Sequence, residues 1–456
     1  MMKKLNYKNI YIIGIEGNGT SALASMYKKM GVNVSGSDDG DHFYQKMLND
    51  SGIETFEKYD KENIPENVDL VVHSTVVRED NPELIEAKAG ELKVLSYPEA
   101  LAELFNAKDG IAVSGTHGKT TTAAMLATAM KKLGSSPSAI VGSKVIEWNG
   151  NSIAGDSNYF IIEADEYQNK LRFYNPQHAI LTSVDYDHPD FFENFDVYKD
   201  AFRDFVKRIP VTGILVYCND SRDVIDVSKD AKCHKVSYGF TEGSDYQIDI
   251  KKGKKLKVFE VIHSGESLGV FEIKFPGKHN MLNATSVIAL CNELGLESFL
   301  AGKFLSSFEG TARRFERVGQ RDGAILIDDY AHHPEAIVTT LKTLRDIYAD
   351  KNIITVFHPH SFSRTEALLS EFSQSFENTD QLIVLDIYGS REESGNVSSR
   401  DLVGLVNTYD RGKATNISTV DEVVEMLKNR IDDNDIVISM GAGDVWRVTH
   451  KLAGKI

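Results

Sequence analysis

The sequence predicts an α/β protein built from three domains. Short apolar runs bounded by Gly, Asp or Pro alternate with longer segments of helical periodicity, a pattern typical of parallel sheets covered by helices. The chain has 456 residues, and at roughly 100–200 residues per domain this length favours several domains over one. Hydrophobic residues make up 41% and charged residues 26% of the chain, a composition that provides for several cores.

The apolar runs indicate three consecutive doubly wound units. Predicted strands cover residues 10–14, 33–36, 70–73, 110–114, 159–163, 179–184, 213–217, 324–328, 353–357, 381–386 and 435–440. We expect domains at residues 1–107, 108–310 and 311–456. The first limit follows a helical segment near 103–109, and the second falls near 310–315, before a strand-rich pattern that starts at Gly319. The basic run 251–257 is predicted to be a solvated hairpin.

Charge and cysteine content exclude several classes of protein. The formal charge is 51 − 67 = −16, which opposes nonspecific binding to nucleic acid or to anionic membranes, so an anionic ligand must be held by local donors. Cys218, Cys233 and Cys291 are far apart and odd in number, which favours reduced thiols in a cytoplasmic protein. No run approaches the roughly 18 apolar residues of a membrane span. The short N-terminal apolar run stops at Gly14 and is interpreted as a buried strand, not a signal peptide.

A phosphate-binding loop is predicted where a strand turns into a helix. Residues 110–114 read as a buried strand, and the helical pattern from Thr120 runs to Lys132. In the turn between them, Gly115 and Gly118 allow backbone N–H groups to converge on phosphate oxygens, Lys119 adds a positive charge, and the helix N-terminus adds its dipole. The pattern is a shortened Walker motif, and the alternative is a glycine-rich turn with a solvated lysine.

Two further side chains follow strands of the same predicted sheet. Glu163 ends the strand 159–163, and His188 follows the strand 179–184. Because ligands of open α/β sheets bind at the carboxyl ends of strands, both could face a phosphate-bound Mg²⁺ together with Thr120. The alternatives are a surface carboxylate for Glu163 and a loop histidine with a structural hydrogen bond for His188.

A second glycine-rich turn lies at the start of the chain. Gly14, Gly17 and Gly19 follow a predicted strand and open a helix, an arrangement suited to a pyrophosphate. Asp38 comes after the second strand, where a carboxylate could meet a ribose hydroxyl. The alternative is a glycine turn that allows close helix packing.

Together these motifs resemble the Mur ligases of peptidoglycan synthesis, and the resemblance covers nearly the whole chain. They are GIEGNGTSALA from Gly14, GTHGKTTT from Gly115, EADEY from Glu163, DYDHPDFF from Asp185, PGKHNMLNA from Pro276, RRF from Arg313, DDYAHHP from Asp328 and HPHSFSRT from His358. The resemblance implies a Rossmann-like N-terminal domain for a UDP-sugar, a P-loop ATPase-like central domain for ATP, and a Rossmann-like C-terminal domain for an amino acid. It also implies Mg²⁺, a cytoplasmic location and a monomer or homodimer.

Within the family, the chain most resembles the branch that joins L-alanine to UDP-N-acetylmuramate. HPHSFSRT and the later segment with Arg391, Glu392, Glu393 and residues 395–399 favour that branch. Its nearest alternative is the branch that attaches an intact L-alanyl-γ-D-glutamyl-diaminopimelate tripeptide to the same sugar nucleotide. A different class, a non-catalytic nucleotide-binding regulator, is disfavoured because it would not need Lys119, Glu163, His188 and Arg364 together.

Carried over residue by residue, the resemblance implies four groups of side chains. The UDP-sugar would contact Gly14, Gly17, Asn18, Gly19, Thr20, Ser21, Asp38, Ser74 and Thr75. ATP would contact Gly115, Thr116, His117, Gly118, Lys119, Thr120, Thr121, His279, Asn280, Asn283 and Arg314. The amino acid would contact Tyr330, His332, His360 and Arg364, and the metal would be held by Thr120, Glu163 and His188. Lys119, His188, His332 and Arg364 would serve catalysis. For Asn283 and Tyr330 the alternatives are a helix-internal hydrogen bond and a core position.

The sequence also departs from the family pattern at three positions. Phe202 stands in the region where several Mur ligases carry a carbamylated lysine, which agrees with the alanine-adding branch. Ser361 lies where some relatives have Arg, and Thr20 where many have Met.

The segment from Gly310 to Arg313 is the expected hinge for closing the C-terminal domain over the reaction centre.

Overall fold

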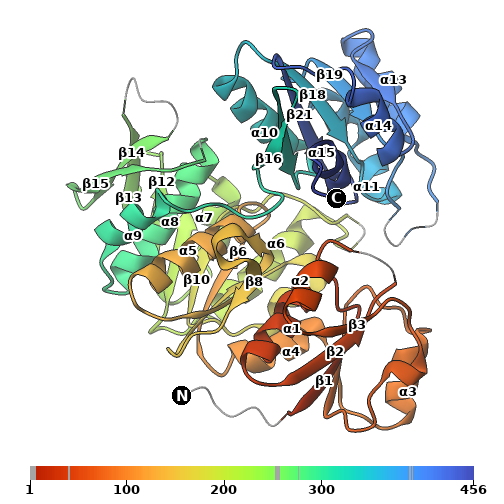
Figure 1. The fold of residues 1–456 in the computed structure, drawn as a ribbon. Coiled ribbons are helices and arrows are strands. Elements are labelled where there is room, and N and C mark those ends of the chain that lie inside the picture. The colour runs from red at the N-terminus through yellow and green to blue at the C-terminus, as the bar shows by residue number, and fades with distance from the viewer. Residues whose placement is uncertain are drawn as a thin grey trace. The chain divides into compact units, whose positions relative to one another are not determined.

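The structure is a computed structural model, and it describes residues 7–39, 42–189, 191–251, 257–275, 277–389, 392 and 394–456. These residues form two compact units. The first consists of Met1–Asp187 and Asn194–Gly310 and holds two sheets; the second consists of His188–Glu193 and Thr311–Ile456 and holds a third sheet (Figure 1). The three-domain α/β prediction is therefore matched by three separate sheets.

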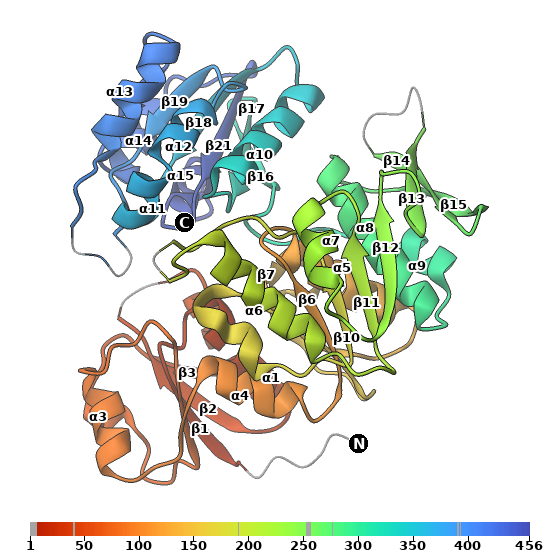
Figure 2. The same ribbon diagram turned by 180° about the vertical axis from the view of Figure 1, so that it is seen from behind.

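The first sheet is fully parallel, with strand order β3-β2-β1-β4-β5. Helices α1 and α4 cover one face and α3 covers the other, as both ribbon views show (Figures 1 and 2). Its elements are β1 (Asn9–Ile13), α1 (Asn18–Lys29), β2 (Asn33–Ser37), α2 (Gln45–Asp50), β3 (Glu54–Phe56), η1 (Lys61–Asn63), β4 (Leu70–His73), α3 (Pro82–Ala89), β5 (Val94–Ser96) and α4 (Tyr97–Phe105). Strand β1 is buried over nearly its whole length, as central parallel strands are.

The second sheet has ten strands in the order β15-β14-β13-β12-β11-β10-β6-β9-β7-β8. Its elements are β6 (Asp109–Ser114), α5 (Lys119–Lys132), β7 (Ser138–Val145), η2 (Ile146–Trp148), β8 (Gly150–Ile153), β9 (Tyr159–Glu163), η3 (Tyr167–Phe173), β10 (His178–Leu181), α6 (Phe195–Lys207), β11 (Ile214–Cys218), α7 (Arg222–Ser228), β12 (His234–Gly239), β13 (Tyr246–Ile250), β14 (Val258–His263), β15 (Glu266–Glu272), α8 (Lys278–Glu293) and α9 (Ser298–Leu305). The strands from β13 to β7 are parallel to their neighbours, whereas β8, β14 and β15 are antiparallel.

The third sheet, in the second unit, has the order β16-β17-β21-β18-β19-β20, with β16 antiparallel to the rest. Its elements are β16 (Glu316–Arg321), β17 (Ala324–Asp329), α10 (Pro334–Ile347), β18 (Asn352–Phe357), α11 (Phe362–Ala367), α12 (Leu369–Gln374), β19 (Gln381–Val384), α13 (Ser399–Tyr409), β20 (Ala414–Asn416), α14 (Val420–Leu427), β21 (Asp435–Met440) and α15 (Trp446–Leu452). Apolar cores on both faces attach α10, α12 and α13 to one side and α14 and α15 to the other.

Every strand predicted from an apolar run is present within a few residues, and the phosphate loop does join β6 to α5. The prediction of doubly wound units alone was incomplete, because antiparallel strands with weaker apolar patterns extend the central sheet. Strands β13 and β14 form the predicted hairpin around the basic run, whose residues 252–256 lie outside the described part. Connecting segments follow α4 and α9, but the predicted domain limits at 107 and 310 stay predictions.

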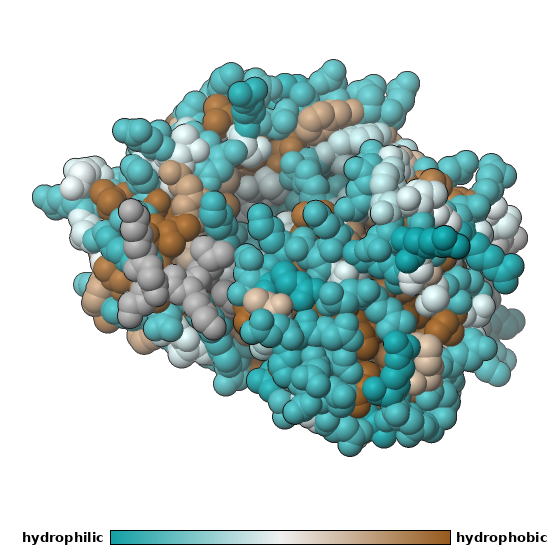
Figure 3. Space-filling model, turned by 90° about the horizontal axis from the view of Figure 1, so that it is seen from above, coloured by the Kyte–Doolittle hydropathy of each residue, from teal (hydrophilic) through white to brown (hydrophobic). Residues whose placement is uncertain are grey.

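Among the described residues, none of the helices combines the length and the apolar character that a bilayer crossing requires. On the face drawn in Figure 3, hydrophilic side chains predominate and apolar ones form small scattered groups. Pro276, Arg391 and Glu393, which belong to motifs singled out in the sequence, lie outside the described residues.

Phe105 is the last residue of α4 and lies buried in the core of the first unit. Its ring is fully buried and meets the rings of Phe160 and Tyr174 edge-on at centroid distances of 6.3 and 5.8 Å. We expect Phe105→Ala to lower the free energy of unfolding by about 3–5 kcal/mol, because it leaves a cavity in a packed core. Urea titration followed by circular dichroism measures this. Tyr409→Ala, which removes an exposed aromatic ring, should change it by less than about 0.5 kcal/mol; equal effects of the two variants would contradict the prediction.

Candidate active site

The N-terminal glycine turn is held against the start of α1. The Thr20 hydroxyl donates to the carbonyl oxygens of Gly14 and Gly17 at 2.6 and 3.2 Å, and Gly17 precedes the first residue of the helix. A side chain at Gly19 would meet the ring of Tyr97 within 2.8 Å, so only glycine allows this close packing of α4 on α1. The helix N-terminus provides backbone N–H groups that suit a pyrophosphate.

Around this turn, the other predicted UDP-sugar residues lie on the first unit. Ser74 follows β4 and its Oγ lies about 4 Å from where a Cβ of Gly17 would be, and Thr75 comes next in the chain. The Ser21 hydroxyl and the Asn18 carbonyl accept from the amide of Asn151 in β8 at 2.9 and 3.3 Å. These two contacts tie the start of α1 to the central sheet.

Asp38 serves the loop itself. Its carboxylate accepts the backbone N–H of Glu16 at 2.8 Å and the hydroxyl of Tyr59 at 3.2 Å, and His42 lies 3.5 Å away. Although burial would raise the pKa of Asp38, the hydrogen bonds from His42 and Glu16 hold it below its usual value. The carboxylate thus fixes the backbone beside the glycine turn, and its contact with a ribose stays a prediction.

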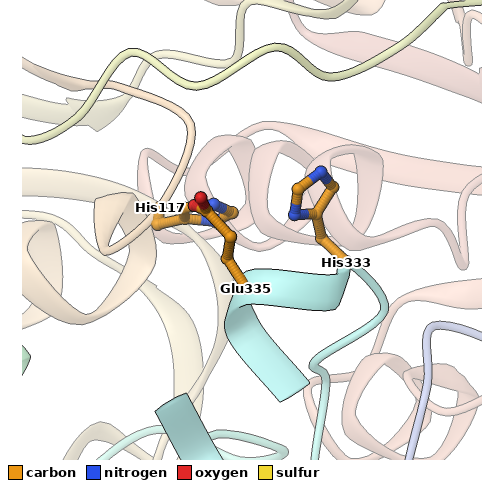
Figure 4. A group of neighbouring side chains, drawn as sticks. All are labelled: His117, His333 and Glu335. Atoms are coloured by element: carbon orange, nitrogen blue, oxygen red, sulfur yellow. The ribbon is translucent and has the colours of Figure 1, made fainter. Parts of the chain in front are cut away.

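The central phosphate loop has its backbone set by neighbouring strands. Gly118 has φ +80°, a conformation that favours glycine, and its α-carbon faces the side-chain amide of Asn283 from α8. His117, drawn in Figure 4, donates its backbone N–H to the Ser183 hydroxyl at 2.8 Å, and the N–H of Thr116 bonds to the Ser183 carbonyl at 3.1 Å. The loop is therefore fixed in shape by the residues that follow β10.

Lys119 is the first residue of α5 and folds back over this loop. Its ammonium donates to the carbonyl oxygens of Gly115 and Thr116 at 2.6 and 3.1 Å and to the carboxylate of Glu166 at 2.8 Å. Burial would lower the pKa of Lys119, but the negative charges of Glu166 and Asp165 raise it above its usual value. The ammonium is therefore charged and stands where phosphates would arrive.

Thr120 and Glu163 come together as predicted from their positions at the sheet edge. The Thr120 hydroxyl donates to a Glu163 oxygen at 2.8 Å, and the other oxygen of that carboxylate accepts the Gly142 N–H at 2.7 Å. A hydroxyl and a carboxylate are oxygen donors of the kind that Mg²⁺ prefers. The residues present thus fit a magnesium ion beside the phosphate loop.

Three of the residues predicted to contact ATP lie at the start of α8, where the resemblance implies the adenine base. His279 and Asn280 occupy its first turn, and Asn283 lies one turn later beside Gly118. Burial lowers the pKa of His279 to about 4, so its ring is neutral and offers both a donor and an acceptor to a base. Thr121, one residue after Thr120, lies in the first turn of α5.

In the second unit, the predicted amino-acid residues form a cluster of basic and aromatic side chains. Arg364 is only 6% exposed, and its guanidinium lies 3.4 Å from Nδ1 of His360 and 3.2 Å from Nδ1 of His188. Because arginine can only donate, both rings accept at Nδ1. His188 itself has φ +58°, and its place among metal ligands stays a prediction.

The remaining members of this cluster surround Tyr330. The Tyr330 ring lies 5.2 Å from the ring of His332, and the guanidinium carbons of Arg313 and Arg314 each lie 4.9 Å from its centre. Nδ1 of His332 lies 2.9 Å from the Tyr330 carbonyl. Because a carbonyl only accepts, Nδ1 of His332 donates to it, and in the neutral form of the ring Nε2 would be the nitrogen without a proton.

The structure adds residues that the motifs did not single out. Glu166 accepts hydrogen bonds from Lys119 of the phosphate loop and from Tyr198. Tyr388 stacks on His360 with a 5.7 Å distance between the ring centroids. Figure 4 also shows His333 and Glu335 where α10 begins. Glu166 could have been noticed as the second glutamate of EADEY, whereas Tyr198 and Tyr388 give no local signal because each is brought in from a distant segment.

Comparisons with known proteins show the family to which this chain belongs. Family models described as "Mur ligase family, catalytic domain", "Mur ligase middle domain" and "Mur ligase, glutamate ligase domain" match residues 9–109, 113–291 and 313–443. With such coverage, the fold and the phosphate loop define an α/β nucleotide-dependent ligase. The chain belongs to the Mur ligase family.

Similar proteins span almost the whole chain. UDP-N-acetylmuramate–L-alanine ligase of Caldanaerobacter subterraneus is 37% identical, with 98% of this chain and 97% of the relative covered, and the protein of that name from Clostridium acetobutylicum is 38% identical, with 98% of each covered. The crystal structure of UDP-N-acetylmuramate-alanine ligase from Thermotoga maritima has a TM-score of 0.83 at 24% identity over 99% of both chains. A murein peptide ligase from Psychrobacter arcticus has a TM-score of 0.78 at 24% identity over 98% of both, so both share this fold.

The pair of His42 and Asp38 generates a prediction about pH. The hydrogen bond to Asp38 raises the pKa of His42 to about 9, from a usual value near 6.5. Its contribution to stability is therefore complete below about pH 6.5 and is lost as the pH rises through about 9. Because the ring is half-exposed, we expect His42→Asn to lower the melting temperature by about 1–3 °C at pH 6 and by less at pH 10. If the difference in melting temperature between the unchanged chain and His42→Asn stays constant from pH 6 to pH 10 in thermal scans, the prediction is wrong.

Proposed function

We propose that this chain is an ATP-dependent ligase that joins L-alanine to the lactyl carboxylate of UDP-N-acetylmuramate in the synthesis of peptidoglycan precursors. The observation that carries the proposal is the set of relatives with that printed name, 34–38% identical over nearly their full length. The loop contacts of Lys119 and the basic cluster around Arg364 support it. The reaction would take place in the cytoplasm, which fits three buried free cysteines.

The reaction must make a carboxylate reactive toward an amine. In the proposed first step, a lactyl oxygen attacks the γ-phosphorus of ATP and the bond from this phosphorus to the β-phosphate oxygen breaks. The products are ADP and an acyl phosphate of the sugar nucleotide. Lys119 offsets the negative charge that builds up on the transferred phosphoryl group. Thr120 and Glu163 would hold a magnesium ion, whose charge would assist this transfer and would stabilise the oxyanion that forms when the amine attacks in the second step.

In the second step, the amine of alanine attacks the acyl carbon and inorganic phosphate leaves. Arg364 binds the alanine carboxylate, because a guanidinium matches a carboxylate with two parallel hydrogen bonds. We assign the uptake of the ammonium proton to Nε2 of His332, because Nδ1 of that ring already donates to the Tyr330 carbonyl, ahead of His188, whose Nδ1 faces Arg364. Arg314, beside Tyr330, is the proposed contact with ATP from this unit.

The deciding experiment measures phosphate release from ATP and Mg²⁺ by the full chain. We expect release only when UDP-N-acetylmuramate and L-alanine are both present, and less when the L-alanyl-γ-D-glutamyl-diaminopimelate tripeptide replaces L-alanine. Lys119→Ala should reduce the rate by about a thousandfold or more, because phosphoryl transfer loses its cation. It should also lower the melting temperature, because Glu166 is left as a buried carboxylate without its cation, so circular dichroism at the assay temperature checks that the variant is folded. Release that needs no amino acid, or a preference for the tripeptide, would refute the proposed function.

Arg364 provides a separate test of the amino-acid site. We expect Arg364→Lys to raise the KM for L-alanine by about tenfold or more with a smaller change in the KM for ATP, because an ammonium cannot bind a carboxylate with two parallel bonds. Initial rates at varied L-alanine and varied ATP measure both constants. The exposed Arg400, the second residue of α13, gives the matched control Arg400→Lys. An unchanged KM for L-alanine would remove Arg364 from the site.

A further inference from the structure

Glu166 is a buried carboxylate that pairs with the lysine of the phosphate loop. Its side chain is about 1% exposed, and one carboxylate oxygen accepts the Lys119 ammonium at 2.8 Å. The other accepts the hydroxyl of Tyr198 at 3.2 Å. Burying a carboxylate costs several kcal/mol unless it is paired and hydrogen-bonded, and here both conditions are met.

Tyr198 links this carboxylate back to the loop. Its hydroxyl lies 2.8 Å from the hydroxyl of Thr116, and its side chain is fully buried in α6. Burial and the nearby charge of Glu166 raise the pKa of Tyr198 well above its usual value, so the hydroxyl keeps its proton and donates. Tyr198 therefore joins Thr116 of the loop to Glu166, and the hydrogen bond that it donates fixes the position of the carboxylate.

The three N–H donors of Lys119 are all engaged in this state. They reach two loop carbonyls and Glu166, and an ammonium has no fourth donor. An arriving phosphate oxygen must replace one of these acceptors. The carboxylate is the strongest of the three because it is charged, so a loop carbonyl gives way and Lys119 remains on Glu166.

Resting on the proposed function, we propose that Glu166 is a positioning residue that aims Lys119 at the phosphoryl group to be transferred. The pair has no net charge, so Glu166 weakens the attraction of the loop for ATP while it fixes the direction of the ammonium. Glu166 thus lowers the affinity for ATP in the ground state and keeps the Lys119 ammonium oriented during phosphoryl transfer. Glu166 acts through Lys119 and does not itself touch the reacting atoms.

Glu166→Gln tests this, because it keeps the shape and removes the charge. We expect the Kd for ATP with Mg²⁺, measured by calorimetry on the full chain, to fall by about tenfold as one negative charge leaves the loop. The kcat should also fall, by about tenfold, because the ammonium loses its orientation. AMP, which lacks the phosphates that a loop lysine reaches, should bind with unchanged affinity.

Two further variants separate positioning from a general loss of stability. Glu260→Gln removes a carboxylate that pairs with Lys251 in the β13–β14 hairpin and should leave both Kd and kcat unchanged. Tyr198→Phe removes the donor to Glu166 and should lower kcat by about threefold with an intact fold; if Glu166→Gln does not fold, this variant decides. An unchanged Kd and kcat, or a fall of both affinity and kcat in step with the melting temperature, would overturn the proposal. Because the Kd for ATP needs neither sugar nor amino acid, this result is independent of the ligase assay.

Discussion

The buried pair of Lys119 and Glu166 is the interaction on which the central site depends. Two opposite charges removed from water stay stable only when each is held by further hydrogen bonds. The loop carbonyls supply these for Lys119 and Tyr198 supplies one for Glu166. The pair therefore requires the loop after β6, the turn after β9 and helix α6 to be correctly placed at the same time.

Strand register brings these groups together. Strands β6 and β9 are parallel neighbours, with Val113 opposite Glu163, so the chain segments that leave them start side by side. Glu163 thus meets Thr120 at the first turn of α5, and Glu166, three residues further, meets Lys119. A shift of one residue would turn these side chains to the other face of the sheet. The site is in this sense a consequence of sheet pairing.

Sequence patterns could predict the parts that follow directly from a strand end. Glu163 ends an apolar run and Lys119 stands in a glycine-rich turn, so their neighbourhood follows from the rule that ligands bind at the carboxyl ends of parallel strands. Glu166 lies beyond the strand in an irregular turn with positive φ angles at Gln168 and Asn169, whose direction no periodicity encodes. Tyr388 and Tyr198 likewise reach their sites through tertiary packing. Asp38 was found from its position, but the structure engages its carboxylate in the loop.

The overall charge of −16 sharpens the physical task of a protein that is to bind polyanionic substrates. A negative net charge gives no long-range attraction for a polyanion, so under the proposed function recognition depends on donors fixed at short distance, such as the N-terminus of α1, the loop N–H groups and Lys119. A partner carboxylate next to the only lysine of the phosphate loop looks unfavourable for affinity. It becomes favourable when orientation limits the rate, because interactions that strengthen only during transfer raise kcat, whereas uniform attraction for ATP does not. The position of Glu166 is therefore consistent with a site shaped for phosphoryl transfer more than for tight nucleotide binding.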